Sequence, residues 1–422
     1  MQLSAHQRIV RLASLTAVHR AFHWLHLHQP QMRRWQLEMV RIPAPPFGES
    51  ERAAWFLERF HSLGLTNVHR DEEGNALAEL APDRPSHKSS GDGPCILISA
   101  HLDTVFPAGT PCEPLEEPDS SRIYAPGICD NGAGLSALLA IAAALRFAHI
   151  TPTIPILFAA NVGEEGEGDL RGMRHLFHRG DYRNRIAAAI ALEGSGNSAV
   201  VTRALGSLRF RVTVSGPGGH SWSDAGVPNP IMLLSRALAA IDSLELPTDP
   251  LTTLNVGHIS GGTSVNSIPS SATALVEVRS TDSAALAATA SEIRRIFEEQ
   301  VAGHAALGKA NTDPKVHIEQ IGDRPAAVLA DDSLLLETVK AVDRHLNLGT
   351  EQRIGSTDAN IPLSLGIPAI AIGTGGTGAN IHTLQEWYDP ANRETALRRI
   401  LLTLLAITQI TAQHQAGIHS TS

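Results

Sequence analysis

The amino-acid sequence predicts an α/β fold in which a mostly parallel sheet carries helices on both of its faces. Four short apolar runs have the composition of fully buried strands, and they lie at residues 95–100, 154–160, 186–192 and 367–372. Segments with helical periodicity, such as the Ala/Leu-rich residues 130–147, separate these runs. Strands that alternate with helices in this way are typical of a mostly parallel sheet.

A different pattern interrupts this alternation. Its strands, expected at residues 208–215, 252–259, 271–279 and 315–321, include segments that alternate apolar and polar side chains, as half-exposed strands do. Helices are expected at residues 229–244 and 283–303. The sequence therefore predicts a first domain in two parts, residues 1–206 and 323–422, and an inserted antiparallel α+β domain at residues 207–322.

The other elements of the first domain follow from periodicity and from the positions of glycine and proline. Two short strands flank a turn within residues 68–80, and the proline-rich residues 42–48 cannot be helical. The polar residues 82–94 predict a surface loop. Further helices are expected at residues 6–28, 31–42, 49–65, 172–179, 331–346 and 392–415.

Composition is that of an ordinary globular protein and excludes several classes of function. Of the 422 residues, 43% are hydrophobic and 18% are charged. The net charge of −9 argues against nucleic acid as a partner, because phosphate binding needs basic patches. No apolar stretch reaches the ~18–20 residues of a membrane span, and residues 1–30 lack the apolar core of a signal peptide. Three cysteines without metal-type spacing suit a reducing compartment, so we expect a cytoplasmic protein without a membrane partner.

Side chains that bind metal ions recur at the ends of the predicted strands and in the loops that follow them. Parallel sheets place functional sites beyond the carboxyl ends of their strands, so these groups can converge. Two histidines and three carboxylates suit two Zn²⁺ ions with one bridging carboxylate. The candidates are His101 with Asp103, Asp130, Glu164 with Glu165, Glu193, and His382.

Taken singly, each of these residues has an ordinary structural explanation. Asp130 would cap a helix, and His101 would be a hydrogen-bonded core histidine. The adjacent pair Glu164 and Glu165 would be a solvated acidic loop. The occurrence of all of them at corresponding places in an α/β pattern favours a metal site instead. Adjacent side chains on extended backbone diverge, so one glutamate can bind a metal while its neighbour moves a proton.

Four sequence motifs resemble the signature of a known metallohydrolase family. It is the dizinc family of carboxypeptidase G, aminoacylase, succinyl-diaminopimelate desuccinylase, acetylornithine deacetylase and peptidase T, and the resemblance covers residues 35–410 approximately. It implies a mixed sheet of the zinc exopeptidase type, with the inserted residues 207–322 as a lid and dimerisation domain. The motifs are His101-Leu102-Asp103-Thr104-Val105, Gly127-Ile128-Cys129-Asp130-Asn131-Gly132, Gly163-Glu164-Glu165-Gly166 and the late His382.

The resemblance also implies a role for each residue of these motifs. Glu164 would be the general base and acid that activates the water, and Asp103 would orient the imidazole of His101. Two zinc ions per chain are implied, with Co²⁺ or Mn²⁺ as alternative metals. One would be bound by His101 and Glu193, the other by Glu165 and His382, and Asp130 would bridge them.

Three residues of the inserted domain also match family patterns. The glycine-rich segment at residues 216–221 contains His220, which the resemblance makes a residue that reaches the neighbouring subunit's active site and stabilises the oxyanion. Asn266 and Arg279 would contact substrate, Arg279 by pairing with a carboxylate in two-pronged fashion. The alternatives are an incidental histidine in a hairpin and a strand-surface arginine in a salt bridge.

The run Gly373-Thr374-Gly375-Gly376-Thr377-Gly378 matches the spacing of dinucleotide-binding loops. The residues from Asn380 onward do not open as an amphipathic helix, and Pro390 follows soon after. Without a strand–turn–helix context this motif is weak, so we expect the glycines to let backbone approach the substrate beside His382.

Together these residues predict zinc-dependent hydrolysis of an amide or peptide bond in a small peptide or N-acyl amino acid with a free carboxylate. Glutamate at the position of Glu193 resembles the carboxypeptidases and N-deacylases of the family. The Thr357-Asp358-Ala359 loop resembles peptidase T, so an aminopeptidase or dipeptidase is the alternative. A metal-free binding relative is a third class, which the intact ligands and base disfavour. The resemblance also implies a homodimer formed through the inserted domain.

Overall fold

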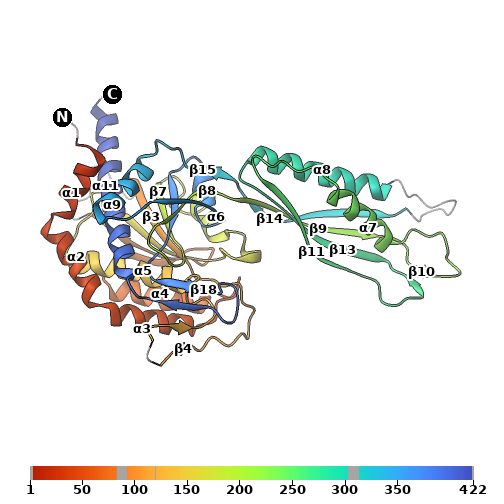
Figure 1. The fold of residues 1–422 in the computed structure, drawn as a ribbon, viewed down its shortest axis with the longest axis horizontal. Helices are drawn as coiled ribbons and strands as arrows, with labels where there is room; N and C mark the ends of the chain where they lie inside the picture. Colours follow the sequence, from red (N-terminus) through yellow and green to blue (C-terminus); the bar gives the residue numbers. More distant parts are fainter. Residues whose placement is uncertain (1–2, 83–92, 119, 303–312, 421–422) are drawn as a thin grey trace. The chain divides into compact units, whose positions relative to one another are not determined.

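The computed structural model describes residues 3–82, 93–118, 120–302 and 313–420. The loop expected at residues 82–94 therefore falls largely outside the described residues. The chain forms two compact units (Figure 1). The discontinuous unit comprises Met1–Arg203 with Val328–Ser422, and the inserted unit comprises Ala204–Ala327.

The discontinuous unit is built on a mixed sheet with the strand order β1-β2-β6-β3-β7-β17-β8-β15, and β16 pairs with β8. The four central strands β6, β3, β7 and β17 are parallel to one another, which confirms the predicted sheet. β2 and β8 are antiparallel to β6 and β17. The strands are β1 (Thr66–Arg70), β2 (Ala76–Leu80), β3 (Cys95–His101), β6 (Ile156–Asn161), β7 (Ile186–Leu192), β8 (Ala199–Ala204), β15 (Ala327–Val328), β16 (Glu351–Gly355) and β17 (Ala369–Ile372).

Helices pack on this sheet through small and aliphatic side chains. α5 lies against β3, β6 and β7, and its residues 132–145 are all buried because alanine and glycine allow close approach. α11 contacts β3 and β7, and α4 covers β1 and β2. The helices are α1 (Ala5–Ala13), α2 (Thr16–Leu27), α3 (Gln29–Val40), α4 (Ser50–Ser62), α5 (Gly132–Phe147), η1 (Gly166–Gly168), α6 (Arg171–His178), α9 (Leu334–Leu346), α10 (Asn360–Ser364) and α11 (Arg393–Ser420).

The N-terminal helices differ from the prediction. The single helix expected at residues 6–28 is divided into α1 and α2 at Ser14 and Leu15. Pro30 lies inside the first turn of α3 rather than between two helices. Proline is tolerated there because the first backbone N–H groups of a helix have no intrahelical partner.

α11 contains the one stretch of the described residues that is long and apolar enough to cross a membrane, at Arg393–His414. The sequence alone indicated no such stretch. Within the structure 72% of the apolar window is buried, because the helix packs against α9, α5 and the central strands. This is how a core helix of a folded unit behaves.

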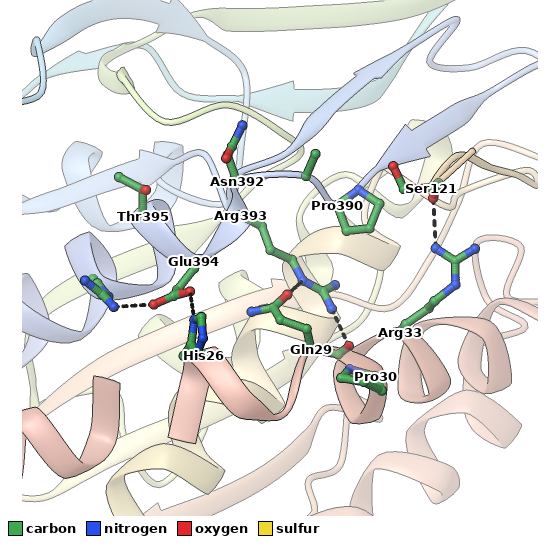
Figure 2. A pocket seen from close by; sticks show the side chains of 12 residues that line it. His26, Gln29, Pro30, Arg33, Ser121, Pro390, Asn392, Arg393, Glu394 and Thr395 are labelled. Atoms are coloured by element: carbon green, nitrogen blue, oxygen red, sulfur yellow. Dashed lines mark hydrogen bonds and ion pairs between the residues drawn. The ribbon is translucent and has the colours of Figure 1, made fainter. Parts of the chain in front are cut away.

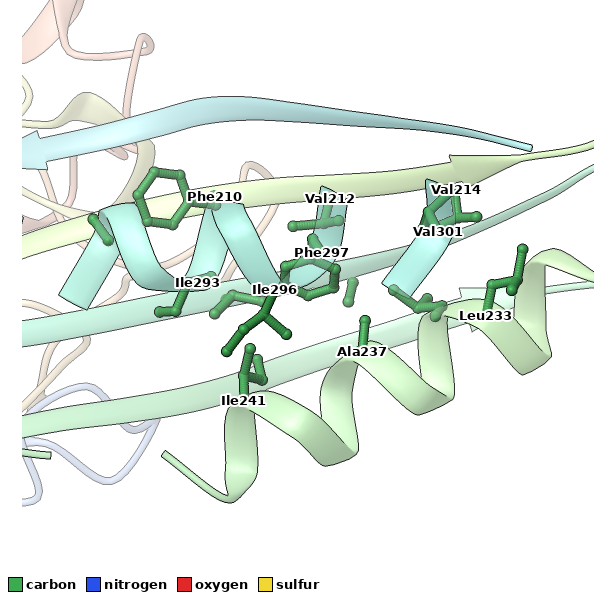
Figure 3. Packing of buried hydrophobic residues seen from close by; sticks show 14 of the residues in the cluster. Phe210, Val212, Val214, Leu233, Ala237, Ile241, Ile293, Ile296, Phe297 and Val301 are labelled. Carbon is green, nitrogen blue, oxygen red and sulfur yellow. The ribbon is translucent and has the colours of Figure 1, made fainter. Parts of the chain in front are cut away.

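The inserted unit contains an antiparallel sheet with the strand order β11-β13-β9-β14. Alternate residues of β9, among them Phe210, Val212 and Val214, point toward α7 and α8 and form one core with Phe297 (Figure 3). Two short strands, β10 and β12, pair separately. The elements are β9 (Gly206–Ser215), β10 (Gly219–His220), α7 (Pro230–Asp242), β11 (Thr252–Gly261), β12 (Ser267–Ile268), β13 (Ser271–Ser280), α8 (Ser283–Ala302) and β14 (Lys315–Arg324).

A small antiparallel sheet of the discontinuous unit joins two segments that are distant in sequence. Its order is β18-β19-β5-β4. The strands are β4 (Leu115–Glu116), β5 (Ile123–Tyr124), β18 (Thr377–Ala379) and β19 (Trp387–Asp389). The glycine run at residues 373–378 thus leads into β18 and not into a helix. The sheet brings the segment before Asp130 beside the segment that contains His382.

Candidate metal centre

His101 is the last residue of β3 and is almost fully buried. Its Nδ1 lies 3.0 Å from the carbonyl oxygen of Asp103 and 3.6 Å from the Asp103 carboxylate. A carbonyl oxygen only accepts, so Nδ1 carries the hydrogen and donates it. This arrangement leaves Nε2 facing the other candidate ligands, 3.1 Å from Oδ1 of Asp130 and 3.7 Å from Oε1 of Glu193.

Asp130 lies between the two histidines. Its Oδ1 faces Nε2 of His101 at 3.1 Å, and its Oδ2 faces Nε2 of His382 at 3.1 Å. One carboxylate thus offers one oxygen to each of two neighbouring donor groups. Asn131, not Asp130, caps α5, since its side chain accepts the N–H of Gly134. The capping role considered for Asp130 is therefore wrong.

Glu164 and Glu165 follow β6, and both are buried. The Asp103 carboxylate accepts both backbone N–H groups, that of Glu164 at 2.9 Å and that of Glu165 at 2.7 Å. Gly163 precedes the pair with a φ of +65°, and a Cβ there would meet the side chain of Arg171 at 2.5 Å. Glycine is therefore required to start this turn.

The donor atoms form three overlapping groups, each with its atoms within 4.8 Å of one another. Four carboxylates face two imidazoles, so the cluster has excess negative charge even when both imidazoles are protonated. Divalent cations compensate such a charge, and this donor set suits zinc. The groups are His101 with Asp130 and Glu193, Asp130 with Glu165 and His382, and His101 with Glu164 and Glu165.

The pKa values show how strongly these groups interact. Burial raises the pKa of Glu193 to about 7, and the charge of Asp130 acts in the same direction. Hydrogen bonds to Asp130 and Glu165 raise the pKa of His382 to about 10. Burial opposes the charged form of His101, but hydrogen bonds to Asp103 and Asp130 outweigh it and raise its pKa. A histidine binds a metal ion through a neutral imidazole. A bound metal ion would therefore replace the imidazole protons that are hydrogen-bonded to the carboxylates in this structure.

The predicted residues His220, Asn266 and Arg279 belong to the inserted unit, whereas the metal cluster belongs to the discontinuous unit. His220 and Asn266 come together, since β10 pairs with β12 and the N–H of Ser221 donates to the carbonyl of Asn266 at 3.0 Å. Nδ1 of His220 accepts the N–H of Trp222 at 3.2 Å, so Nε2 is the ring nitrogen left to donate.

Arg279 is held by Glu277, a residue that the sequence analysis did not single out. Nε and Nη2 of Arg279 donate to the Glu277 carboxylate at 2.8 and 2.9 Å. The two residues are two positions apart on β13, so their side chains share a face. That spacing was the signal available in the sequence. Arg209 donates to the same carboxylate at 2.9 Å.

A cavity of about 770 Å³ lies elsewhere in the discontinuous unit, where α2 and α3 meet the start of α11 (Figure 2). None of the candidate metal ligands lines it. Along its wall Arg393 donates to the neutral side chain of Gln29 at 2.7 Å, and Glu394 pairs with His26 at 2.9 Å and with Arg398. This cavity is therefore distinct from the metal cluster.

Comparison with known proteins relates the chain to a family of peptidases. A family model described as Peptidase family M20/M25/M40 matches residues 97–406. The uncharacterized protein YqjE of Bacillus subtilis is 26% identical over 371 residues, which are 83% of this chain and 91% of that protein. A probable carboxypeptidase of Aspergillus clavatus is 31% identical over 57% of this chain. The match spans about half of that carboxypeptidase, 56% of its length.

Solved structures show the same fold. A tripeptidase from Staphylococcus aureus has a TM-score of 0.72 at 23% identity, over 90% of this chain and 98% of that one. The aminopeptidase PepT from Bacillus cereus has a TM-score of 0.69 at 21% identity, over 90% and 99%. A dinuclear metal-binding M20 peptidase from Bacillus subtilis has a TM-score of 0.61 at 15% identity, over 90% and 98%. The chain belongs to the peptidase family M20/M25/M40 and is a metallohydrolase.

Proposed function

We propose that this protein is a dizinc enzyme that hydrolyses an amide or peptide bond in a small peptide or N-acyl amino acid with a free carboxylate. The placement of Asp130, with one carboxylate oxygen toward each histidine, carries the proposal. Such a carboxylate suits the bridge between two metal ions. His101 and Glu193 would hold one ion, and Glu165 and His382 the other.

Two bound zinc ions supply a water of lowered pKa and polarise the carbonyl of the scissile bond. Glu164 would accept a proton from the attacking water and would return it to the leaving amine. Asp103 fixes both backbone N–H groups of Glu164 and Glu165. The two side chains do not diverge as expected from the sequence, since one carboxylate oxygen of each lies within 4.8 Å of the other and of His101. His101 is fixed in the tautomer that leaves Nε2 for the metal.

The experiment that tests this role is Glu164→Gln. The amide has the size of the carboxylate but cannot accept the proton, so kcat should fall by about 10²–10⁴ while both zinc ions remain bound. Glu167→Gln is the matched control, because Glu167 lies three residues later on the same loop and is exposed. Near-normal turnover in Glu164→Gln would remove this residue from the mechanism.

Two observations bear on the substrate in opposite directions. Glutamate at position 193 and the probable carboxypeptidases among the relatives favour cleavage next to a C-terminal carboxylate or removal of an N-acyl group. The tripeptidase and aminopeptidase neighbours in structure favour a free amino terminus. A zinc-loaded activity panel of N-acyl amino acids against dipeptides and tripeptides with free amino termini decides between the two.

Arg279 remains our proposed carboxylate ligand, with Asn266 as a second substrate contact. Glu277 occupies the edge of the guanidinium formed by Nε and Nη2. The other edge still offers one hydrogen from each terminal nitrogen, which is sufficient for two parallel bonds to a substrate carboxylate. Arg279→Ala should raise KM mainly for substrates with a free carboxylate, and equal effects on the matching amides would refute the role.

The inserted unit supports the further proposal of a homodimer. β11 is an edge strand of ten residues, and most of them are exposed. An unpaired edge of this length can pair with the same strand of a second copy. His220 would then stabilise the oxyanion in the partner's site through its Nε2 hydrogen. A monomeric mass by light scattering at micromolar concentration would refute the dimer.

An inactive binding protein is the other functional class, and metal analysis separates it from an enzyme. About two zinc ions per chain after reconstitution support the enzyme. No bound zinc after reconstitution would refute the proposed metal centre.

A further inference from the structure

Glu386 lies outside the proposed ligand set, yet its carboxylate binds the segment that carries the proposed bridging ligand. The side chain is fully buried. Oε2 accepts the N–H of Gly127 at 2.9 Å. Oε1 accepts the N–H groups of Cys129 at 2.8 Å and Asp130 at 2.9 Å. One carboxylate thus fixes three backbone groups that lead into Asp130.

The same residue belongs to the segment that carries His382. The N–H of Glu386 donates to the carbonyl of Thr383 at 3.1 Å, so His382 and Glu386 lie on one compact turn. The carbonyl of Glu386 accepts the N–H of Ala125 at 3.2 Å, just before β19 pairs with β5. The backbone of the turn and the side chain of Glu386 therefore both hold the segment that ends at Asp130.

Two acceptor oxygens are needed at this position to satisfy all three donors. Burial raises the pKa of the Glu386 carboxyl to about 7, although the three N–H groups act to lower it. A glutamine has one acceptor oxygen, and its NH₂ group would face the N–H of at least one partner, donor against donor. Among the described residues, no lysine, arginine or histidine pairs with the Glu386 carboxylate. Burying a carboxylate without a counter-ion is costly unless hydrogen bonds replace its water. Here the three backbone N–H groups provide that replacement.

We propose that Glu386 is a positioning residue that sets the place of Asp130 relative to His382. Its loss would loosen the donor group formed by Asp130, Glu165 and His382. The group of His101 and Glu193 also includes Asp130, but it depends on Glu386 less, because its other two members are held at the ends of β3 and β7. The inference rests on the proposed metal centre, but it does not depend on which amide bond is cleaved.

Zinc titration of the metal-free protein, with a competing chelator, tests the inference. In Glu386→Gln the zinc site of Glu165 and His382 should weaken by about 10–100-fold, and the site of His101 and Glu193, which shares only Asp130 with it, should weaken clearly less. His382→Ala is the reference, because it removes a ligand of the same site and should weaken the same one. A purely structural role would weaken both sites together, so equal loss at both sites, or no loss, overturns the inference.

The matched control is Asp71→Asn. The Asp71 carboxylate also accepts three backbone N–H groups, those of Glu73, Gly74 and Asn75, at 2.9–3.1 Å. These partners all lie in the β1–β2 turn and not in a ligand-bearing segment. Asp71→Asn should leave both zinc affinities unchanged, and a site-selective loss in this control would count against the inference.

Amide hydrogen exchange gives a readout that needs neither metal nor substrate. In the metal-free wild-type protein the amides of Gly127, Cys129 and Asp130 should be protected, and Glu386→Gln should lose this protection while β3 keeps its own. Rapid exchange of these amides in the wild type overturns the inference even where the variant does not fold. A wild type that binds no zinc refutes the proposed function, whereas two-site binding left unaltered in Glu386→Gln refutes this inference alone.

Discussion

Asp103→Asn is the most informative single change in the proposed metal centre. The Asp103 carboxylate is fully buried and accepts the N–H groups of Glu164 and Glu165 on separate oxygens, at 2.9 and 2.7 Å. It also faces Nδ1 of His101 at 3.6 Å. Asparagine keeps the shape of the side chain but replaces one acceptor oxygen by an NH₂ group.

The expected cost follows from these contacts. One of the two N–H groups would face a donor, and leaving a buried donor unpaired costs about 1–3 kcal/mol. The remaining bond would change from a charged to a neutral acceptor, which costs about 1 kcal/mol more. The Glu164–Glu165 segment would move to relieve this combined cost of about 2–4 kcal/mol. We therefore expect zinc affinity or kcat to fall by about 10–100-fold, the usual effect of removing a group that orients a ligand.

Zinc titration of the metal-free protein and kcat at saturating zinc measure this effect. Asp71→Asn is again the control, since it makes the same substitution in a half-buried turn outside the cluster. A variant at position 103 that binds zinc and turns over like the wild type would refute the argument that this carboxylate holds the glutamate pair in place.

Other changes test the packing and the charges. Asp343→Ala should destabilise the protein by about 3–5 kcal/mol, because it leaves the buried Arg399 without the bonds of 2.6 and 2.7 Å that it donates to Asp343. The double variant Asp343→Leu with Arg399→Met should recover most of the lost free energy of unfolding, measured in urea. A double variant as unstable as Asp343→Ala would contradict the explanation. Phe297→Ala should cost the inserted unit about 3–5 kcal/mol, measured by hydrogen exchange of β9 and β13, since its ring is fully buried. Partial burial acts to raise the pKa of Glu277, but the guanidinium groups of Arg279 and Arg209 outweigh it and lower the pKa from 4.5 to about 2. This contribution to stability is present above pH 4.5 and is lost as the pH falls toward 2. In Glu277→Gln the free energy of unfolding should therefore depend less on pH between 4.5 and 2. An unchanged pH dependence in this range would contradict the explanation. Removal of metal by a chelator should abolish hydrolysis and lower Tm, and zinc at 100 times its Kd should restore about 2.7 kcal/mol of stability.

The central strands were predictable from sequence because each is a short, wholly apolar run. β3, β6, β7 and β17 lie within two residues of their expected positions. The N-terminal helices were less predictable. Nothing in the periodicity of residues 6–28 marks the break between α1 and α2, and Pro30 signals a boundary although a first helical turn accepts it. Such boundaries depend on packing against α9 and α11, which local sequence does not report.

The candidate ligands were also visible in the sequence, because metal-binding side chains recur together at the ends of several buried strands. Their mutual orientation was not. The two-sided placement of Asp130 depends on the register of β3 and on the segment of His382, which are 281 residues apart in sequence, from position 101 to position 382. The ion pair between Arg279 and Glu277 could have been predicted, because residues two positions apart on a strand such as β13 share a face. No sequence pattern predicts that Glu386 binds three backbone N–H groups, because its partners lie more than 250 positions earlier in the chain.

The sequence by itself determined the sheet type, the family resemblance and the identity of the chemically active side chains. These depend on composition, spacing and residue type, which are properties of the chain before it folds. Only the tertiary structure decided which oxygen of Asp130 faces which imidazole, and that Asp103 fixes the Glu164–Glu165 pair through its backbone. Such contacts join segments that chain connectivity leaves far apart, and they are set when the strand register and the small β5–β19 sheet bring those segments together.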